Sequence, residues 1–320
     1  MKKFRVGILV GATNIKTGLF DQDMELVDQM QTLTDQEADL DRLMDFIETL
    51  VRRIVEKNGL AMEDILGVGV SLPSYIDYEK GLVLDTDNIM YLSNAPVRDL
   101  LHARLNVPIA LENDANAAAL AEHHLGAGVG FDHMIYAALS TGIGGGLILN
   151  GKLYRGMHGM AGEIGHAFVS DSTGYPCPCG VTGCAQSISS GAYMAKYVTD
   201  RIKEGYDSSI LNYAGTLSNI DMEAVGKALQ TNDPLAMEVV NRGAEYLGRM
   251  FHTLNQIFDI NVFIYGGGVA KLGPRFIDRM IACYRHYSLI DQRYPAKFIP
   301  AKFGDRAAMY GAALLLTQDS

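Results

Sequence analysis

The feature that most constrains this chain is a short apolar strand that runs into a glycine-containing turn and then into a second strand, and it occurs twice. In the first copy the turn Gly11-Ala12-Thr13 lies between apolar runs at 5–10 and 15–20. In the second, Thr141–Gly146 follows the run HMIYAAL and precedes a strand at 147–150. Such turns let backbone N–H groups face a phosphate, although they also simply close hairpins. Two of them in successive α/β halves would suit one nucleotide held between two domains.

Strands and helices are expected to alternate along the rest of the chain. Apolar residues recur at helical spacing from Leu40 to Val55, and Gly59 stands just past the end of that pattern. The other expected elements are strands at 65–72, 107–113 and 261–266, an alanine-rich helix at 115–125, a long amphipathic helix at 234–259 and a closing helix at 307–316. This order predicts an α/β layer architecture.

Length and composition limit the classes of function. With 320 residues, 48% of them hydrophobic and 20% charged, the chain is long enough for two globular domains. A net charge of −10 argues against sequence-independent binding to nucleic acid, which needs a positive surface. The run Val6–Val10 is too short for a signal-peptide core, and no window has the roughly 18 apolar residues of a membrane span. We therefore expect a cytoplasmic protein that contacts neither nucleic acid nor membrane.

Three of the four cysteines fall within eight residues of one another and follow a histidine. His166, Cys177, Cys179 and Cys184 have the spacing His-x10-Cys-x-Cys-x4-Cys. Three thiolates and an imidazole satisfy tetrahedral zinc, and a full set of protein ligands is typical of a closed, structural site. The alternative is a group of free buried thiols with an unrelated histidine. The clustering favours the metal.

Asn113 and Asp114 stand where a strand is expected to end and a helix to begin. Both residue types are preferred helix N-caps, which is a sufficient structural reason for their presence. An ionised Asp at the carboxyl end of a strand in an α/β protein is also placed to accept a hydroxyl proton during group transfer. Spacing alone leaves these alternatives open.

Glu163 lies three residues before His166, and a metal-bound histidine would hold this carboxylate rigidly, as a ligand-orienting group requires. The run YGGGVAKLGP at 265–274 is a further glycine turn, ambiguous when taken alone. None of the glycine turns is a Walker A loop, because no Gly-Lys-Ser/Thr follows.

Taken in order, LENDANAAALAE, STGIGGGLILNGKLYRG, GMAGEIGH and CPCGVTGCAQ resemble the ROK family of bacterial sugar kinases and related repressors. GGGV at 266–269 and the C-terminal YGAALL resemble that family's adenosine-side elements, so the similarity spans nearly the whole chain. It implies an actin-like, hexokinase-type (ribonuclease H-like) fold with ATP and sugar in the cleft between two α/β domains. The small domain would be 1–117, closed by a helix at about 306–320. The large domain would be 118–305, with a zinc knuckle at 166–184.

The resemblance also implies residue roles. Asp114 matches the catalytic base, and Asp114 and Asn113 together match contacts to sugar hydroxyls. Glu163, His166 and Gln186 match further sugar ligands. His166 would bind the sugar through one ring nitrogen and zinc through the other. The nucleotide side, with Mg²⁺ bound to ATP, matches Gly11, Ala12, Thr13, Asn14, Ser140, Thr141, Gly142, Gly266, Gly267 and Gly268. The structural zinc ligands would be His166, Cys177, Cys179 and Cys184.

Two departures from the family pattern bear on activity. Gln186 stands where a Glu binds sugar hydroxyls, and an amide keeps an acceptor while gaining donors. Leu9 occupies the place of an Asp that helps to hold magnesium, and Asn14 replaces a basic residue. Asp21 and Asp305 are the candidate substitutes for the missing acid.

We expect an ATP-dependent kinase of a hexose or hexose derivative that acts as a homodimer or homotetramer. The alternative is a sugar-binding sensor of kinase ancestry, because the Leu9 side chain has no atom that can coordinate magnesium. A repressor is disfavoured, since the kinase core begins at residue 5 and leaves no room for a helix-turn-helix before it. Sugar stereochemistry would be read by loops around 71–77 and Asn88.

Overall fold

The computed structural model describes residues 3–35, 38–86 and 89–317. By density of internal contacts the chain forms two compact units. Unit 1 comprises the described parts of 1–136, 146–162 and 302–320, and unit 2 comprises 137–145 and 163–301. The predicted domain boundaries at 117/118 and 305/306 stay a prediction, since a contact-dense unit is not the same thing as a folding domain.

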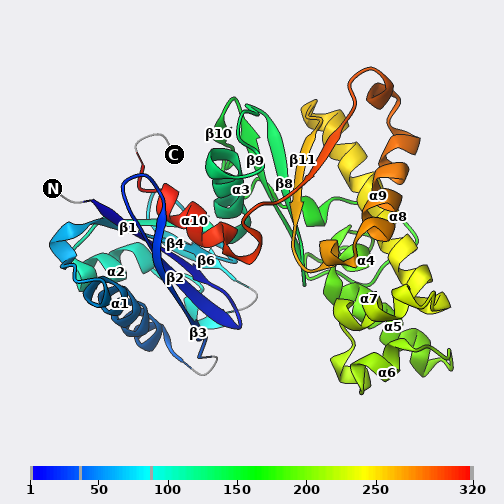
Figure 1. Cartoon of the computed structure of the whole chain (residues 1–320), viewed down its shortest axis with the longest axis horizontal. Coiled ribbons are helices and arrows are strands. Elements are labelled where there is room, and N and C mark those ends of the chain that lie inside the picture. The colour runs from blue at the N-terminus through cyan, green and yellow to red at the C-terminus, as the bar shows by residue number, and fades with distance from the viewer. Residues whose placement is uncertain (1–2, 36–37, 87–88, 318–320) are drawn as a thin grey trace. The chain divides into compact units, whose positions relative to one another are not determined.

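The first sheet belongs to unit 1 and has the order β3-β2-β1-β4-β7 (Figure 1). Its strands are β1 (Phe4–Val10), β2 (Asn14–Phe20), β3 (Leu26–Leu33), β4 (Ile65–Leu72) and β7 (Ile109–Asn113). β1, β2 and β3 are antiparallel neighbours, whereas β4 and β7 run parallel to β1. The hairpin predicted around residues 11–13 is confirmed, with Val10 opposite Ile15 and Leu9 opposite Lys16.

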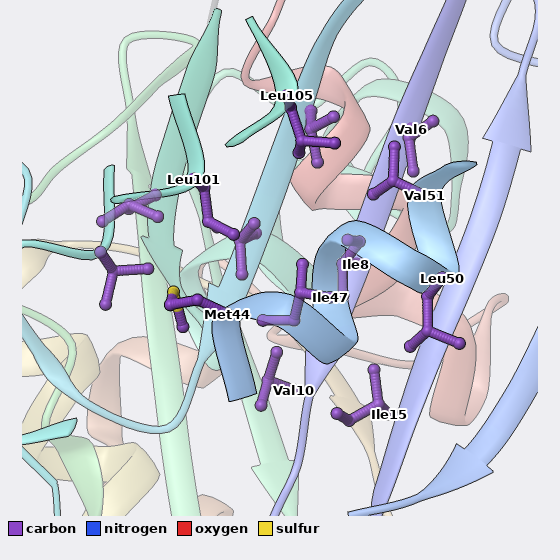
Figure 2. Close-up of a cluster of buried hydrophobic side chains, with 14 of the residues drawn as sticks. Val6, Ile8, Val10, Ile15, Met44, Ile47, Leu50, Val51, Leu101 and Leu105 are labelled. Atoms are coloured by element: carbon purple, nitrogen blue, oxygen red, sulfur yellow. The ribbon is translucent and has the colours of Figure 1, made fainter. Parts of the chain in front are cut away.

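One face of this sheet is covered by α1 (Leu40–Lys57) and α2 (Val97–Leu105). Asp39 caps α1 by accepting the N–H of Arg42, which satisfies one of the unpaired donors of the first turn. The apolar positions of α1 recur at three- and four-residue spacing, so they form one stripe that faces the sheet. Figure 2 shows Ile47 and Leu50 of α1 among side chains of β1 and β2, and Met44 belongs to the same buried cluster.

The opposite face of the sheet contacts α10 (Ala307–Leu314), which also packs along α3 (Asp114–Leu125). Gly69 of β4 permits this approach, because a Cβ at that position would lie 1.8 Å from the carbonyl oxygen of Ala312. Gly311 does the same toward α3, where a Cβ would lie 1.7 Å from the Ala117 carbonyl oxygen. The predicted closing helix is thus confirmed within residues 307–316, and residues 318–320 lie outside the described residues.

The remaining described elements of the N-terminal region are short. They are η1 (Met62–Asp64), β5 (Tyr75–Asp77), β6 (Leu82–Asp85) and η2 (Met90–Leu92), of which β5 and β6 form a two-stranded antiparallel sheet.

The second five-stranded sheet has the order β10-β9-β8-β11-β12. Its strands are β8 (Met134–Leu139), β9 (Ile143–Leu149), β10 (Lys152–Leu153), β11 (Val262–Gly266) and β12 (Lys297–Pro300). The division between the units falls within β8 and β9. β9 and β10 are antiparallel, and β11 and β12 are parallel.

The helices of unit 2 include the long amphipathic helix that the sequence predicts, α8 (Pro234–Phe258). The others are α4 (Gln186–Ser189), α5 (Gly191–Lys203), α6 (Ile210–Ala214), α7 (Met222–Gln230) and α9 (Pro274–Tyr287), with single turns η3 (Ile164–His166), η4 (Leu217–Asn219), η5 (Val269–Leu272) and η6 (Leu289–Gln292). α8 packs on α9, and Phe251 of α8 meets Phe263 of β11 edge-on at a centroid distance of 5.0 Å. Among the described residues, no helix combines the length and apolar character needed to cross a bilayer.

The core of unit 1 generates a first prediction. Ile47 is fully buried between α1 and the sheet, so Ile47→Ala should lower the free energy of unfolding by about 2–5 kcal/mol, the usual cost of such a cavity. Thr49→Ala, two residues away on the exposed side of α1, is the matched control and should change stability by less than about 0.5 kcal/mol. Urea denaturation monitored by circular dichroism measures both, and equal effects would contradict this placement of the core.

Candidate active site and metal cluster

The first glycine turn is braced by Thr34, the residue that follows β3. Within the turn, the Gly11 N–H donates to the Asn14 carbonyl (3.0 Å). Thr34 donates its hydroxyl to the Gly11 carbonyl (2.7 Å) and its N–H to the Thr13 carbonyl (2.9 Å). The predicted phosphate-binding residues Gly11, Ala12, Thr13 and Asn14 therefore form one fixed turn within unit 1.

Leu9, next to this turn, lies on the face of the sheet that meets α10. Its partly buried side chain packs on the cluster that contains Met309 and Tyr310. Its cross-strand partner is Lys16, whose Nζ contacts Asp305 at Oδ2 (2.5 Å) and at the carbonyl oxygen (2.9 Å). The Lys16 side chain is only 15% exposed. This position therefore carries a leucine beside the Lys16–Asp305 ion pair in place of an aspartate.

The two candidate substitutes for the missing acid already have protein partners. Asp305 holds Lys16, and Asp21 accepts the N–H groups of Asp23 and Glu25 through Oδ1 (2.9 Å each) in the turn between β2 and β3. A role for either carboxylate at a metal stays a prediction.

Asn113 ends β7 and caps α3. Its Oδ1 accepts the N–H groups of Ala115 (2.9 Å) and Asn116 (3.2 Å), which confirms the N-cap interpretation. Asp114 is the first residue of α3, and its Oδ1 accepts the Ala115 N–H (2.8 Å). Burial raises the pKa of Asp114 above its ordinary value, and backbone N–H donors offset part of that rise.

Sequence reasoning missed the residue before them. Glu112 is fully buried, and Arg155 Nε donates to its Oε2 (2.7 Å). Its Oε1 accepts the Asn113 N–H (3.0 Å) and a short hydrogen bond from the Tyr78 hydroxyl. A charged residue in a largely apolar strand was the available signal, and the partners Tyr78 and Arg155 are 34 and 43 residues away.

The predicted metal ligands come together in unit 2. One donor atom from each of His166, Cys177, Cys179 and Cys184 lies within 4.8 Å of all the others. His166 Nδ1 is 3.4 Å from the Cys177 sulfur, and the sulfurs of Cys179 and Cys184 are 3.5 Å apart. Tetrahedral zinc with Zn–S bonds of about 2.3 Å places ligand atoms about 3.8 Å apart, so this donor set fits the ion.

The two ring nitrogens of His166 face different groups. Nδ1 is turned toward the sulfurs, whereas Nε2 lies 3.9 Å from Oε2 of Glu163. The single turn η3 fixes this spacing, because the His166 N–H donates to the Glu163 carbonyl (3.0 Å). One nitrogen is thus placed for the metal and the other is turned toward the candidate sugar ligand Glu163.

The second glycine turn is built from two parts of unit 2. The Ser140 N–H donates to the Gly142 carbonyl (2.9 Å). The start of α5 packs against this turn: the Gly191 N–H donates to the Ser140 carbonyl (2.8 Å), and the Ala192 N–H donates to the Thr141 carbonyl (3.2 Å). Gln186 joins it, since its Oε1 accepts the Ile143 N–H (3.1 Å).

The turn at Gly266, Gly267 and Gly268 lies beside the Ser140 turn. Gly267 has φ +98°, and a Cβ there would lie 2.3 Å from the carbonyl oxygen of Leu139, the residue before Ser140. The structure therefore brings the residues predicted for the second phosphate turn and for the adenosine side into one neighbourhood. Asn88, named for sugar recognition, lies outside the described residues.

Comparison with known proteins adds to this geometry. The model of the ROK family matches residues 5–319. A glucokinase of Halalkalibacterium halodurans is 31% identical over 99% of this chain and 96% of its own length. An N-acetylgalactosamine kinase of a Shewanella species is also 31% identical, over 97% of this chain and 95% of its own.

Among solved structures, a ROK family glucokinase from Streptomyces griseus in complex with glucose and AMPPNP is 30% identical. It superposes with a TM-score of 0.83 and covers 98% of both chains.

Proposed function

Because the chain belongs to the ROK family, we propose that Asp114 is the base of a sugar kinase reaction and that Asn113 orients the acceptor sugar beside it. The chain is an ATP-dependent sugar kinase with an actin-like, hexokinase-type fold, as the glucokinase and N-acetylgalactosamine kinase relatives over nearly its full length support. The observation that carries the assignment of the base is a carboxylate of raised pKa at the junction of β7 and α3.

In the proposed step, Asp114 accepts the proton of a sugar hydroxyl, commonly the 6-hydroxyl. The hydroxyl oxygen bonds to the γ-phosphorus of ATP while the bond from that phosphorus to the ADP oxygen breaks, and ADP leaves. Mg²⁺, when bound with ATP, would supply charge neutralisation on the phosphates. Leu9 does not fit that ion, because its side chain has no oxygen and its neighbour is the Lys16 ammonium.

The roles of the remaining sugar-binding, nucleotide-binding and metal-binding residues are also proposals. Glu163, His166 and Gln186 would bind sugar hydroxyls, and the turns at 11–14, 140–142 and 266–268 would bind the nucleotide. A zinc ion held by His166 and the three neighbouring cysteines would fix the ring of His166 and stabilise the thiolates. A cytoplasmic location, a homodimeric or homotetrameric state and the lack of a nucleic-acid partner stay predictions.

An ADP-release assay across hexoses, N-acetylhexosamines and fructose tests the proposed function. We expect turnover of at least one of these sugars, in keeping with what the relatives phosphorylate. Sugar binding without turnover anywhere on the panel would refute the kinase and support the sensor.

Asp114→Asn should lower kcat by about 10²–10⁴-fold and leave sugar affinity nearly unchanged, because the amide keeps the shape but not the proton acceptor. In the wild type the ionised form is active, so kcat/KM should fall on acidification with an apparent pKa above the ordinary 3.8. Asp99→Asn on the exposed side of α2 is the control and should behave as the wild type. An Asp114→Asn variant with wild-type kcat would exclude this residue as the base.

Metal analysis should find about one zinc per chain, since one set of four protein donors binds one ion. Cys179→Ser should lose both the metal and sugar affinity, because His166 is then no longer oriented. Cys283→Ser is the matched control: this buried thiol bonds to the Glu245 carbonyl outside the cluster, so its loss should leave the zinc in place. Full sugar affinity in a metal-free protein would disprove the coupling.

Leu9→Asp tests whether the missing acid limits the rate. The introduced carboxylate would face Lys16 across the hairpin, so Leu9→Asp combined with Lys16→Ala should raise kcat more than the single change, by about tenfold or more. Leu9→Asn combined with Lys16→Ala has the same shape without the charge and should give no gain. Unchanged rates in all variants would mean that another residue already holds the metal.

A further inference from the structure

Glu112 is a buried ionisable residue that the proposed chemistry does not use. Its side chain has no exposed surface, yet four donors surround it: the Tyr78 hydroxyl, the Asn113 N–H (3.0 Å), Asn116 Nδ2 (3.2 Å) and Arg155 Nε (2.7 Å). An isolated buried carboxylate is costly, and this one is fully paired. Because apolar residues of similar volume often replace a buried ion pair without loss of stability, stability alone is a poor reason for it.

The donors come from three separate parts of unit 1. Tyr78 follows β5, Asn113 and Asn116 stand at the junction of β7 and α3, and Arg155 follows β10. The Arg155 guanidinium also lies over the Tyr78 ring, 5.1 Å from its centroid. One carboxylate therefore joins the capped end of β7 to two loops.

The second of these loops, residues 155–162, is here named the connecting segment, because the chain passes from unit 1 at Gly162 to unit 2 at Glu163. Its two ends are tied together by the Ala161 N–H, which donates to the Arg155 carbonyl (3.0 Å). Its middle rests on the first loop, since a Cβ at Gly159 (φ +75°) would lie 2.6 Å from the Tyr78 ring. The connecting segment is thus anchored at Arg155 and at Gly159.

The network also fixes Asn113. The Asn113 N–H is bonded to Glu112, and its Oδ1 caps α3, so the direction of its Nδ2 is set. Nδ2 donates to the Ser74 carbonyl at 3.4 Å, which is long for a hydrogen bond and is easily exchanged for a sugar hydroxyl.

A role for Glu112 as a second base does not fit this geometry. Both carboxylate oxygens already accept from protein donors, and the side chain is inaccessible to a sugar hydroxyl. Its influence on the reaction must pass through the residues that it holds.

We propose that Glu112, Arg155 and Tyr78 are positioning residues of the sugar subsite. They hold Asn113 and the connecting segment that leads directly into Glu163, so they set the affinity for the sugar and leave nucleotide affinity unchanged. This inference rests on the proposed function where that function assigns Asn113 and Glu163 to the sugar.

The test compares Glu112→Gln, Arg155→Met and Tyr78→Phe with the wild type, using D-glucose and N-acetyl-D-galactosamine as sugar probes and ADP as the nucleotide probe. Calorimetry gives the Kd of each probe, and steady-state kinetics give the KM of sugar and ATP separately. Glu112→Gln and Arg155→Met should weaken sugar binding by about 10–100-fold, the usual range for a residue that orients a ligand group. Nucleotide Kd should stay within about twofold.

Matched variants separate positioning from stability. Lys152→Met removes an exposed positive charge three residues before Arg155 and should leave sugar affinity unchanged. Tyr78→Phe keeps the ring against Gly159 and loses only the hydroxyl, so its effect should be the smallest of the three. Glu112→Gln combined with Arg155→Met should be no worse than either alone, because the two residues act as one unit.

The outcomes also separate this inference from the proposed function. A wild type that neither binds nor phosphorylates any sugar of the ADP-release panel overturns both. If the wild type binds sugar while Arg155→Met retains its affinity, only this inference is overturned, and turnover is not needed to see it. Equal losses of sugar and ADP affinity, accompanied by a lower melting temperature, would mean a merely structural role and would also overturn it.

Discussion

The close approach of α10 to the first sheet is the constraint on which the arrangement of unit 1 depends. Gly69 and Gly311 lack the side chains that would collide with backbone carbonyls of α10 and α3, so three layers are separated by little more than main-chain contact. The last helix of the chain is thereby fixed against β1 and β4, near the hairpin at 11–14, and α3 is fixed with Asp114 at its start. Dispersion at such short separation is large in total although each atom pair contributes little.

Local patterns carried most of what the sequence could predict. The hairpin at 11–13, the capping Asn113 and the cluster of His166 with three cysteines each depend on residues close together in the chain, so spacing was sufficient to identify them. The helices expected at 115–125 and 307–316 are present as α3 and α10, but their contact was not expected. A close approach that depends on the absence of a Cβ atom produces no apolar stripe in the sequence.

Long-range polar pairs were out of reach for a physical reason. Lys16 and Asp305 are 289 residues apart, and Arg155 and Glu112 are 43 apart. In the sequence of a strand, a charged residue looks the same whether its side chain is exposed to water or paired with a distant residue. The pairing of Lys16 changes the interpretation of Leu9: the hairpin has an ammonium group opposite Leu9, and the counter-charge of that ammonium comes from the segment just before α10. The charge at this position is therefore set by the Lys16–Asp305 ion pair, whose opposite charges largely cancel at longer range.

Glu112 and Asp114, two carboxylates at the junction of β7 and α3, differ in their properties because their surroundings differ. Glu112 accepts from four protein donors, and its fully buried side chain is inaccessible to a substrate. Asp114, two residues later, accepts backbone N–H groups alone among the donors of the described residues, so burial dominates and raises its pKa. A carboxylate that is poorly compensated for its burial is the better proton acceptor, because protonation relieves the cost of desolvation. The fully paired neighbour is the better anchor, because moving it would break several charge-assisted hydrogen bonds at once.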